Sequence, residues 1–372
     1  MVNPPETRSL GTRPLRVLHV VRPAEGGIRQ HVVSLLQQAD TGRVSASLAA
    51  PPAFLQSLPP FPNVTASPIN IAPRFAPGAD FLAAWRLAGL ARRVDVLHAH
   101  GLRAGWVASL AHRLRPFPLV VTAHNVAAGG GWLPRLGVAR IGREAAALLA
   151  VSQAVADSLI SQGVPPGNLR VVPNGVDLAH FAALPERAGM RRQWGLDEGV
   201  FTVACIARLS PEKGVDVLLA ALRLRPEMTC LVAGSGPEQG ALEASLRETG
   251  ARNVRLLGRV TDTRELLAVA DALAVPSRTE GQGIVALEAL AAGVPVVASR
   301  VGGLAEMLTE GQTALLAPPD APRALADALG RLAGDAALRM ALTEQGRALV
   351  QARYDVRQMA ARVAQVYEDI TR

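Results

Sequence analysis

The sequence predicts an α/β protein with two domains, each built on a parallel β-sheet whose faces are covered by helices. The chain has 372 residues, enough for two domains of ordinary size, and 49% of them are apolar, so each domain can bury a core. Short Val-rich runs alternate with helix-like segments along both halves of the chain. This alternation is typical of parallel sheets, which bind ligands at the carboxyl ends of their strands.

Residues 1–13 are expected to form a loose tail, because they lack the apolar segment that a secretory signal requires. No run of 18 apolar residues that could span a membrane follows them. The two cysteines, Cys205 and Cys230, fall in predicted buried strands with no other metal ligands nearby. We therefore expect reduced thiols, no metal site, and a cytoplasmic protein that is either free or peripheral on the inner face of the membrane.

The first domain is expected over residues 14–180. Its opening strand, 15–22, leads to a Gly26-Gly27 turn and then to a helix at 28–38. Because glycines let backbone N–H groups approach an anion, this turn is either a phosphate-binding loop or only a tight turn. It lacks the full Gly-x-Gly-x-x-Gly fingerprint of dinucleotide sites. Further strands are expected at 44–50, 64–71, 94–99, 119–123 and 147–151, and helices at 81–93, 103–113, 134–144 and 153–162.

Two histidines fall at the carboxyl ends of predicted strands. His124 follows the strand at 119–123, and His100 follows the strand at 94–99. We expect His124 to be functional and leave His100 open between a functional and a packing role. His19 and His98 lie within strands, which predicts that they belong to the core.

A linker over residues 181–197 is expected to lead into a second domain at 198–354. A last helix, within residues 355–372, could return to the first domain. Strands of the second domain are expected at 201–206, 229–233, 254–257, 272–275 and 294–298, and helices at 215–224, 238–249 and 263–269.

The stretch EGQGIVALEALAAGVPVVAS, residues 280–299, carries the most specific chemistry. Glu280 precedes a Gly-x-Gly turn, and Glu288 lies on a short helix that begins near Gly283. A helix N-terminus presents unpaired N–H groups and suits a phosphate, while carboxylates suit hydroxyl groups. The stretch therefore predicts a sugar-nucleotide pocket; the alternative is an ordinary helix-to-strand unit with surface glutamates.

The chain contains 38 arginines and a single lysine, Lys213. This lysine follows the strand at 201–206, five residues after Arg208, where an anion would bind in a parallel sheet. Gly234 and the pair Arg259-Val260 follow the next two strands, so several polar loops are expected to meet at one edge of the sheet.

The net charge of +8 is uneven: residues 1–180 carry +9 and residues 181–372 carry −1. An anionic membrane, an anionic acceptor or nucleic acid could bind the basic half. The absence of a nucleic-acid motif and the 3% aromatic content argue against nucleic acid. Together with Trp85, Trp106 and Trp132, the charge favours a membrane-proximal acceptor. The basic segment 103–115 is either a membrane-surface helix or, more commonly for such a helix, a solvated outer face.

Taken together, these motifs resemble the large family of retaining glycosyltransferases called family 4 or group 1. The resemblance implies a GT-B fold, in which two Rossmann-like domains face each other across a cleft. It places the donor on the C-terminal domain and the acceptor on the N-terminal one. One departure is Gln282, where the family usually has Phe. The motifs are Gly26-Gly27, Thr122-Ala-His124, Pro173-Asn-Gly-Val-Asp177, Arg208-x4-Lys213-Gly, Gly234-x-Gly-Pro, Leu-Gly-Arg259-Val and Glu280-x7-Glu288.

The resemblance also implies a role for each matching residue. Arg208 and Lys213 would neutralise the diphosphate of the donor, assisted by backbone N–H groups of the glycine turn and of the helix start. Glu280 and His124 would contact the transferred sugar, and Glu288 would bind the ribose. The remaining donor-binding positions are Gly26, Gly27, Gly234, Arg259, Val260, Gly283, Ile284 and Val285.

The expected activity is transfer of a hexose or hexosamine, with retention, from a nucleotide-diphosphate sugar, in particular a UDP-sugar. The acceptor would be a small molecule, a glycan or a lipid-linked molecule. No Asp-x-Asp motif occurs, so neither a metal nor another cofactor is expected. Two alternatives stay open: a sugar-nucleotide epimerase on the same scaffold, and a non-catalytic protein that binds anions or membranes.

Overall fold

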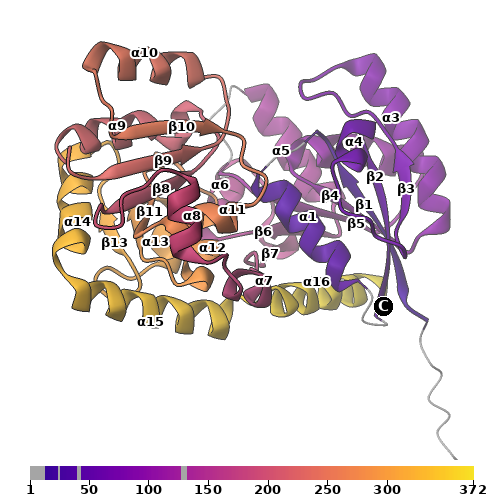
Figure 1. Cartoon of the computed structure of the whole chain (residues 1–372). Coiled ribbons are helices and arrows are strands. Elements are labelled where there is room, and N and C mark those ends of the chain that lie inside the picture. Colours follow the sequence, from indigo (N-terminus) through magenta and orange to yellow (C-terminus); the bar gives the residue numbers. More distant parts are fainter. Residues whose placement is uncertain (1–12, 24–25, 40–42, 127–131) are drawn as a thin grey trace, which may run out of the picture.

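The computed structural model describes residues 13–23, 26–39, 43–126 and 132–372. Two β-sheets occupy opposite halves of the molecule (Figure 1). The first has seven strands in the order β3-β2-β1-β4-β5-β6-β7, and the second has six in the order β10-β9-β8-β11-β12-β13. The strands pair in parallel in both sheets, which confirms the predicted α/β class.

The first sheet alternates with helices, as the Val-rich runs predict. Its elements are β1 (Leu15–Val21), α1 (Gly27–Gln38), β2 (Val44–Ala50), α2 (Pro52–Gln56), β3 (Thr65–Pro68), α3 (Pro77–Leu90), η1 (Ala91–Arg93), β4 (Val96–His100), α4 (Leu102–Leu114), β5 (Leu119–Ala123), α5 (Trp132–Glu144), β6 (Ala147–Ala150), α6 (Gln153–Ser161), η2 (Pro166–Asn168) and β7 (Leu169–Val171).

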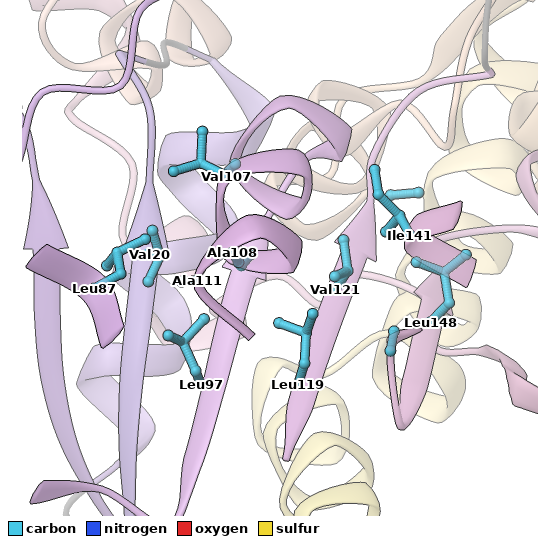
Figure 2. Close-up of a cluster of buried hydrophobic side chains, with 14 of the residues drawn as sticks. Val20, Leu87, Leu97, Val107, Ala108, Ala111, Leu119, Val121, Ile141 and Leu148 are labelled. Atoms are coloured by element: carbon cyan, nitrogen blue, oxygen red, sulfur yellow. The ribbon is translucent and has the colours of Figure 1, made fainter. Parts of the chain in front are cut away.

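The core of the first domain lies on both faces of this sheet, because successive side chains of a strand point to opposite faces. On one face, Val20, Leu97 and Leu119 belong to an apolar cluster with Leu87 of α3 and Val107 of α4 (Figure 2). Complete burial of one such side chain contributes roughly 1.5–3 kcal/mol. Helices α1 and α16 cover the opposite face, so the sheet is buried on both sides.

The second sheet follows the same alternating pattern, and the last helix runs beyond it. Its elements are α7 (Leu178–Ala182), α8 (Arg187–Gln193), β8 (Thr202–Ile206), η3 (Pro211–Lys213), α9 (Val215–Arg223), β9 (Thr229–Ala233), α10 (Gln239–Thr249), β10 (Val254–Gly258), α11 (Thr263–Val269), β11 (Ala272–Val275), α12 (Ile284–Ala292), β12 (Val296–Ser299), α13 (Gly302–Met307), β13 (Leu315–Ala317), α14 (Pro322–Gly334), α15 (Ala336–Arg353) and α16 (Val356–Thr371).

Helix α16 returns to the first domain, as expected. Its Met359, Val363 and Tyr367 are buried in a cluster with Val96 and Val120 of the first sheet. Figure 1 shows this yellow helix beneath the N-terminal half.

Two further contacts tie the domains together. Val176 and Asp355 form a parallel bridge where the chain passes between the domains. The Glu306 carboxylate of α13 accepts hydrogen bonds from the backbone N–H groups of Gln153 and Ala154, at 2.7 and 2.5 Å, at the start of α6. These ties give the two sheets a defined relative position.

Short elements depart from the predictions. The segment predicted as a linker, 181–197, contains α8 and the end of α7. Elements α2, β7, α13 and β13 were not predicted, and β3 is shorter than the expected strand at 64–71. Each of these is too short to show a clear hydrophobic period.

Both cysteines are buried and free, in β8 and β9 as predicted.

The predicted tail, apart from Arg13, and part of the glycine-rich loop after His124 lie outside the described residues. Among the residues that the structure describes, no helix has both the length and the apolar character needed to cross a membrane.

Candidate active site

The only lysine of the chain is paired with the first glutamate of the 280–299 stretch. Lys213 ends η3, and its Nζ lies 2.7 Å from Oε2 of Glu280. The Ser277 hydroxyl also donates to Oε2, at 3.1 Å. The two charged side chains are 25% and 11% exposed, so the pair is only partly screened by water. The fold thus joins two predicted site residues that are 67 positions apart.

The start of α12 meets the glycine turn of the first domain. Gly283 caps the helix with φ 85°, and Ile284 and Val285 are its first residues. The first N–H groups of a helix have no partner within it. A Cβ atom at Gly27 would lie only 3.3 Å from Cδ1 of Ile284, so the Gly26-Gly27 turn lies directly against this helix start. The structure therefore brings together the two predicted anion-binding turns.

Glu288 is a buried residue, not the surface glutamate of the alternative interpretation. It lies in the second turn of α12 and is 9% exposed. Burial raises the pKa of its carboxyl to about 8. An acidic group held this far from water is unusual unless a polar partner binds it.

His124 follows β5 and faces the second domain. It is 8% exposed, and neither ring nitrogen has a hydrogen-bond partner within the described part of the chain. Burial holds the pKa of its imidazole well below the usual range. A Cβ atom at Gly281 would lie 2.0 Å from the carbonyl oxygen of His124, so the loop beside Glu280 reaches the histidine only because it carries a glycine.

The other strand histidines occupy the core. His98 contacts the Tyr367 hydroxyl at 2.6 Å through Nδ1 and the Thr122 hydroxyl at 2.7 Å through Nε2, as its predicted packing role requires. His19 Nδ1 lies 3.0 Å from Nε2 of His100. His100 is fully buried, and its Nδ1 has no partner among the described residues.

Arg208 forms part of a group of three arginines. It is exposed between β8 and η3. Burial, together with the charges of Arg208 and Arg103, lowers the pKa of Arg22, which follows β1. Arg103 donates to Asp80, but its buried Nε and Nη1 have no hydrogen-bond partner in the described chain. The positive charge at this boundary comes from both domains, and Arg22 was not among the predicted site residues although it lies at a strand end.

The remaining predicted donor residues lie on neighbouring loops. Gly234 follows β9, and a Cβ atom there would lie 1.8 Å from the Ala207 carbonyl oxygen, so this loop packs tightly on the Arg208 segment. Arg259 and Val260 follow β10, which is the edge strand and lies two strands from β8. Val260 packs against the same apolar cluster as Val285, whereas Arg259 is exposed.

Gln282 connects the two domains, a role that the sequence did not reveal. Its side chain is 4% exposed; Oε1 accepts from the backbone N–H of Asn174 at 2.6 Å, and Nε2 donates to the carbonyl of the same residue at 3.3 Å. The Asn174 Oδ1 atom in turn lies 2.7 Å from Nδ1 of His31, whose ring centroid is 4.7 Å from that of His124. The position that departs from the family pattern is thus linked to the predicted functional histidine.

The surface of the first domain differs from the expected one. Helix α4 packs between α3 and α5 and buries Val107, so it is not a free amphipathic helix. Trp106 is half-buried with Arg140 over its ring, and the side chain of Trp132 is outside the described set. Four of the exposed large apolar side chains of this domain lie on α3 and the loop before it; they are Phe75, Phe81, Leu82 and Trp85, exposed by 68, 60, 49 and 63%. The others are Leu114, Leu136, Ile160 and Val171, on α4, α5, α6 and β7.

Comparison with known proteins identifies both halves of the chain. Residues 186–349 match the family model described as glycosyl transferases group 1, and residues 25–180 match that of glycosyltransferase family 4. The solved structure of Anabaena Alr3699/HepE in complex with UDP and glucose superposes with a TM-score of 0.86 at 24% identity, over 95% of this chain and 99% of that one. This match confirms the expected GT-B fold.

Curated relatives give the same family. A D-inositol 3-phosphate glycosyltransferase of Mycolicibacterium gilvum is 36% identical over 64% of this chain, and the chain spans only 58% of that relative's length. A GDP-mannose-dependent alpha-(1-6)-phosphatidylinositol monomannoside mannosyltransferase of Mycolicibacterium smegmatis is 34% identical over 69% of this chain and 72% of its own length. The chain therefore belongs to the family 4, or group 1, glycosyltransferases.

Proposed function

We propose that the protein is a retaining glycosyltransferase that moves a hexose or hexosamine from a UDP-sugar to a membrane-proximal acceptor without a metal ion. The observation that carries this proposal is the pairing of Lys213 with Glu280, beside the start of α12 and close to His124 of the other domain. A cation, a set of helix N–H groups and hydroxyl acceptors in one place match the parts of a sugar nucleotide.

In this proposal the diphosphate lies between Lys213 and Arg208 and against the N-terminus of α12. Negative charge grows on its leaving oxygen as the bond to the anomeric carbon breaks, and fixed positive charge stabilises that transition state. The acceptor hydroxyl attacks the anomeric carbon from the same face and passes its proton to the leaving phosphate oxygen. The products are the glycoside and UDP, and no metal is needed because the basic pair supplies the charge.

The carboxylates and the histidine position the rest of the donor. Glu288 accepts hydrogen bonds from the ribose hydroxyls, and Glu280 holds hydroxyls of the sugar. The buried nitrogens of His124 supply polar contacts near the reacting carbon. The choice of UDP is supported by the structurally similar HepE, which was solved with UDP-glucose, although other relatives use GDP-mannose.

The acceptor is proposed to carry an anionic group and to lie at a membrane surface. Arg22 and Arg103 supply positive charge on the acceptor domain, and two buried nitrogens of Arg103 have no hydrogen-bond partner among the described residues. Arg103 also donates to the carbonyl of Arg74, which precedes the exposed Phe75. The apolar patch formed by Phe75, Phe81, Leu82 and Trp85 therefore adjoins this positive charge. Exposed aromatic residues beside arginines are typical of surfaces that dock on anionic lipid. The names of two relatives, with inositol phosphate and phosphatidylinositol mannoside in them, fit such an acceptor.

The test is a donor screen. The purified protein is incubated with UDP-, GDP- and ADP-sugars, with and without a bacterial lipid extract, in the presence of a chelator. We expect UDP release that depends on the extract and a glycolipid product with the donor's anomeric configuration. Conversion of the donor alone into an epimeric UDP-sugar, without UDP release, would favour the epimerase, and no turnover of any donor would reject both.

A further inference from the structure

Three buried histidines of the first domain converge on one point. They are His31 of α1, His100 at the end of β4 and His124 after β5, and each offers a ring nitrogen within 4.8 Å of the others. Their exposed fractions are 2, 0 and 8%. Nε2 of His31, Nδ1 of His100 and both nitrogens of His124 lack a hydrogen-bond partner within the described residues. Buried polar atoms without a hydrogen-bond partner are rare in folded proteins, so a cluster of them indicates a ligand.

Hydrogen bonds to neighbouring residues fix the tautomers of two of these histidines, so that each directs the lone pair of its other ring nitrogen into this space. The Asn174 Oδ1 atom lies 2.7 Å from Nδ1 of His31 and can only accept, so Nδ1 carries the proton and Nε2 presents a lone pair. When His100 donates from Nε2 to Nδ1 of His19, 3.0 Å away, its own Nδ1 presents a lone pair. A partner on the far nitrogen is the usual support of a metal-binding histidine.

The chemical type of the cluster selects a class of ligand. All three imidazoles are buried, and an imidazole binds a metal through the lone pair of a ring nitrogen. Three imidazoles suit zinc, cobalt, nickel or copper and not magnesium or calcium, which prefer oxygen ligands.

The ring positions fit such an ion. The ring centroids are 4.7 Å apart for His31 and His124, 5.3 Å for His31 and His100, and 6.1 Å for His100 and His124. Three imidazoles on a tetrahedral zinc ion have centroids about 5 Å apart and nitrogens about 3.3 Å apart. Small rotations of the three rings would shorten the distances between their nitrogens, now within 4.8 Å, to the separation that zinc requires. The neighbouring trio of His19, His98 and His100 is a poorer candidate, because both nitrogens of His98 are already bonded.

We propose that His31, His100 and His124 bind one divalent ion of the zinc class, with the fourth position open to water or to a hydroxyl group. This binding does not depend on the proposed function. Its consequence does: because His124 is proposed to contact the transferred sugar, an ion held there competes with the donor and inhibits transfer. The site is thus inhibitory and is separate from the metal-free transfer step.

The first test measures binding by the full chain after treatment with a chelator. Cobalt chloride is titrated while the visible absorption of four-coordinate cobalt is followed, and zinc chloride is titrated by calorimetry. We expect one equivalent in the wild-type protein and in His180→Asn, which removes an exposed histidine of the other domain. His31→Gln and His100→Gln should each weaken binding at least 100-fold.

The proposal is overturned if the wild-type protein shows no saturable binding, or if both variants bind as it does. X-ray absorption of the wild-type cobalt complex provides a measurement that needs no variant: three imidazole ligands support the site, and fewer than three contradict it. A transfer assay then separates the two proposals. Stoichiometric zinc should abolish transfer, and a chelator should restore it. Binding without inhibition leaves the metal site intact and rejects the sugar contact of His124.

Discussion

At the scale of single residues, the pair of Lys213 and Glu280 is the chemical centre of the proposed donor site. The two side chains come from loops after neighbouring strands, β8 and β11, and meet at 2.7 Å. An ammonium group is compact, whereas the guanidinium of arginine is planar and larger. Every other Lys or Arg position of the chain is an arginine, so the presence of an ammonium group at this one position indicates a specific role.

We predict that Lys213→Arg keeps the charge but loses activity. The larger head group cannot occupy the same position beside Glu280, so the diphosphate is misplaced and the transfer rate should fall at least 10-fold. Steady-state kinetics and the thermal unfolding midpoint, measured on both proteins, separate a catalytic from a structural effect. An unchanged rate would remove Lys213 from the diphosphate site.

The buried Glu288 makes the stability of the protein depend on pH. An unfolded glutamate ionises near 4.5 and the folded one near 8, so between these values the folded state holds more protons and its stability falls as the pH rises. Glu288→Gln has no such titration. The free energy of unfolding of this variant, relative to that of the wild type, should therefore rise by on the order of 3 kcal/mol between pH 5 and pH 8, as measured by urea unfolding. A pH-independent difference would contradict the elevated pKa.

The site was only partly predictable from the sequence. Lys213, Glu280 and the start of α12 could be found because each follows a strand or opens a helix, and the fold brings those positions together. The contact of His31 with Asn174 could not, because it joins α1 to the segment after β7 across 143 positions of sequence, and the role of Gln282 could not, because it depends on how the two domains meet. No local pattern encodes that relation.

At the scale of elements, the loop before α12 is fastened to the segment after β7 by Gln282. Its two hydrogen bonds to Asn174 cross 108 positions of sequence and join the domains beside the proposed site. A side chain without polar atoms would leave the buried N–H of Asn174 without an acceptor.

We expect Gln282→Leu to lower the free energy of unfolding by about 1–3 kcal/mol, the cost of that unpaired group. It should also raise the KM for the donor, because the helix start is no longer held against the first domain. Chemical unfolding and donor kinetics report the two effects. Gln351→Leu, at an exposed position of α15, serves as the control and should change neither. Equal behaviour of the two variants would show that the contact is unimportant.

Most long elements follow directly from the sequence. Strands β2, β5, β9 and β11 have the predicted bounds, because short Val- and Ala-rich runs between polar loops are distinctive. Helix α8 was missed because its seven residues, five of them polar or Gly, show little hydrophobic period. The exposed face of α3 could not be anticipated either, since its apolar residues look like core until the sheet's coverage is known.

At the scale of the whole molecule, positive charge and exposed apolar side chains are both concentrated on the first domain. Residues 1–180 carry the entire positive excess, and the patch of Phe75, Phe81, Leu82 and Trp85 lies on the same domain. In Figure 1, α3 lies at the outer edge of the N-terminal half, away from the second sheet. Such a face can contact a membrane while the second domain stays in water.

We predict that the protein sediments with phosphatidylglycerol vesicles at low salt and much less with phosphatidylcholine vesicles or at high salt. The double variant Phe81→Ser and Trp85→Ser should bind at least 10-fold more weakly. Met340→Ser provides the matched control, because Met340 is 70% exposed but lies on the other domain. Equal sedimentation of the three proteins would exclude α3 as the docking face.

The proposed function requires that the second domain binds the donor diphosphate through Lys213, a claim that calorimetry with UDP tests directly. The wild-type protein should bind one UDP, Lys213→Ala should bind it at least 100-fold more weakly, and Arg331→Ala, at an exposed position of α14, should bind as the wild type does. The claim would be contradicted if the folded wild-type protein gave no binding heat with UDP or GDP, or if Lys213→Ala bound UDP with unchanged affinity.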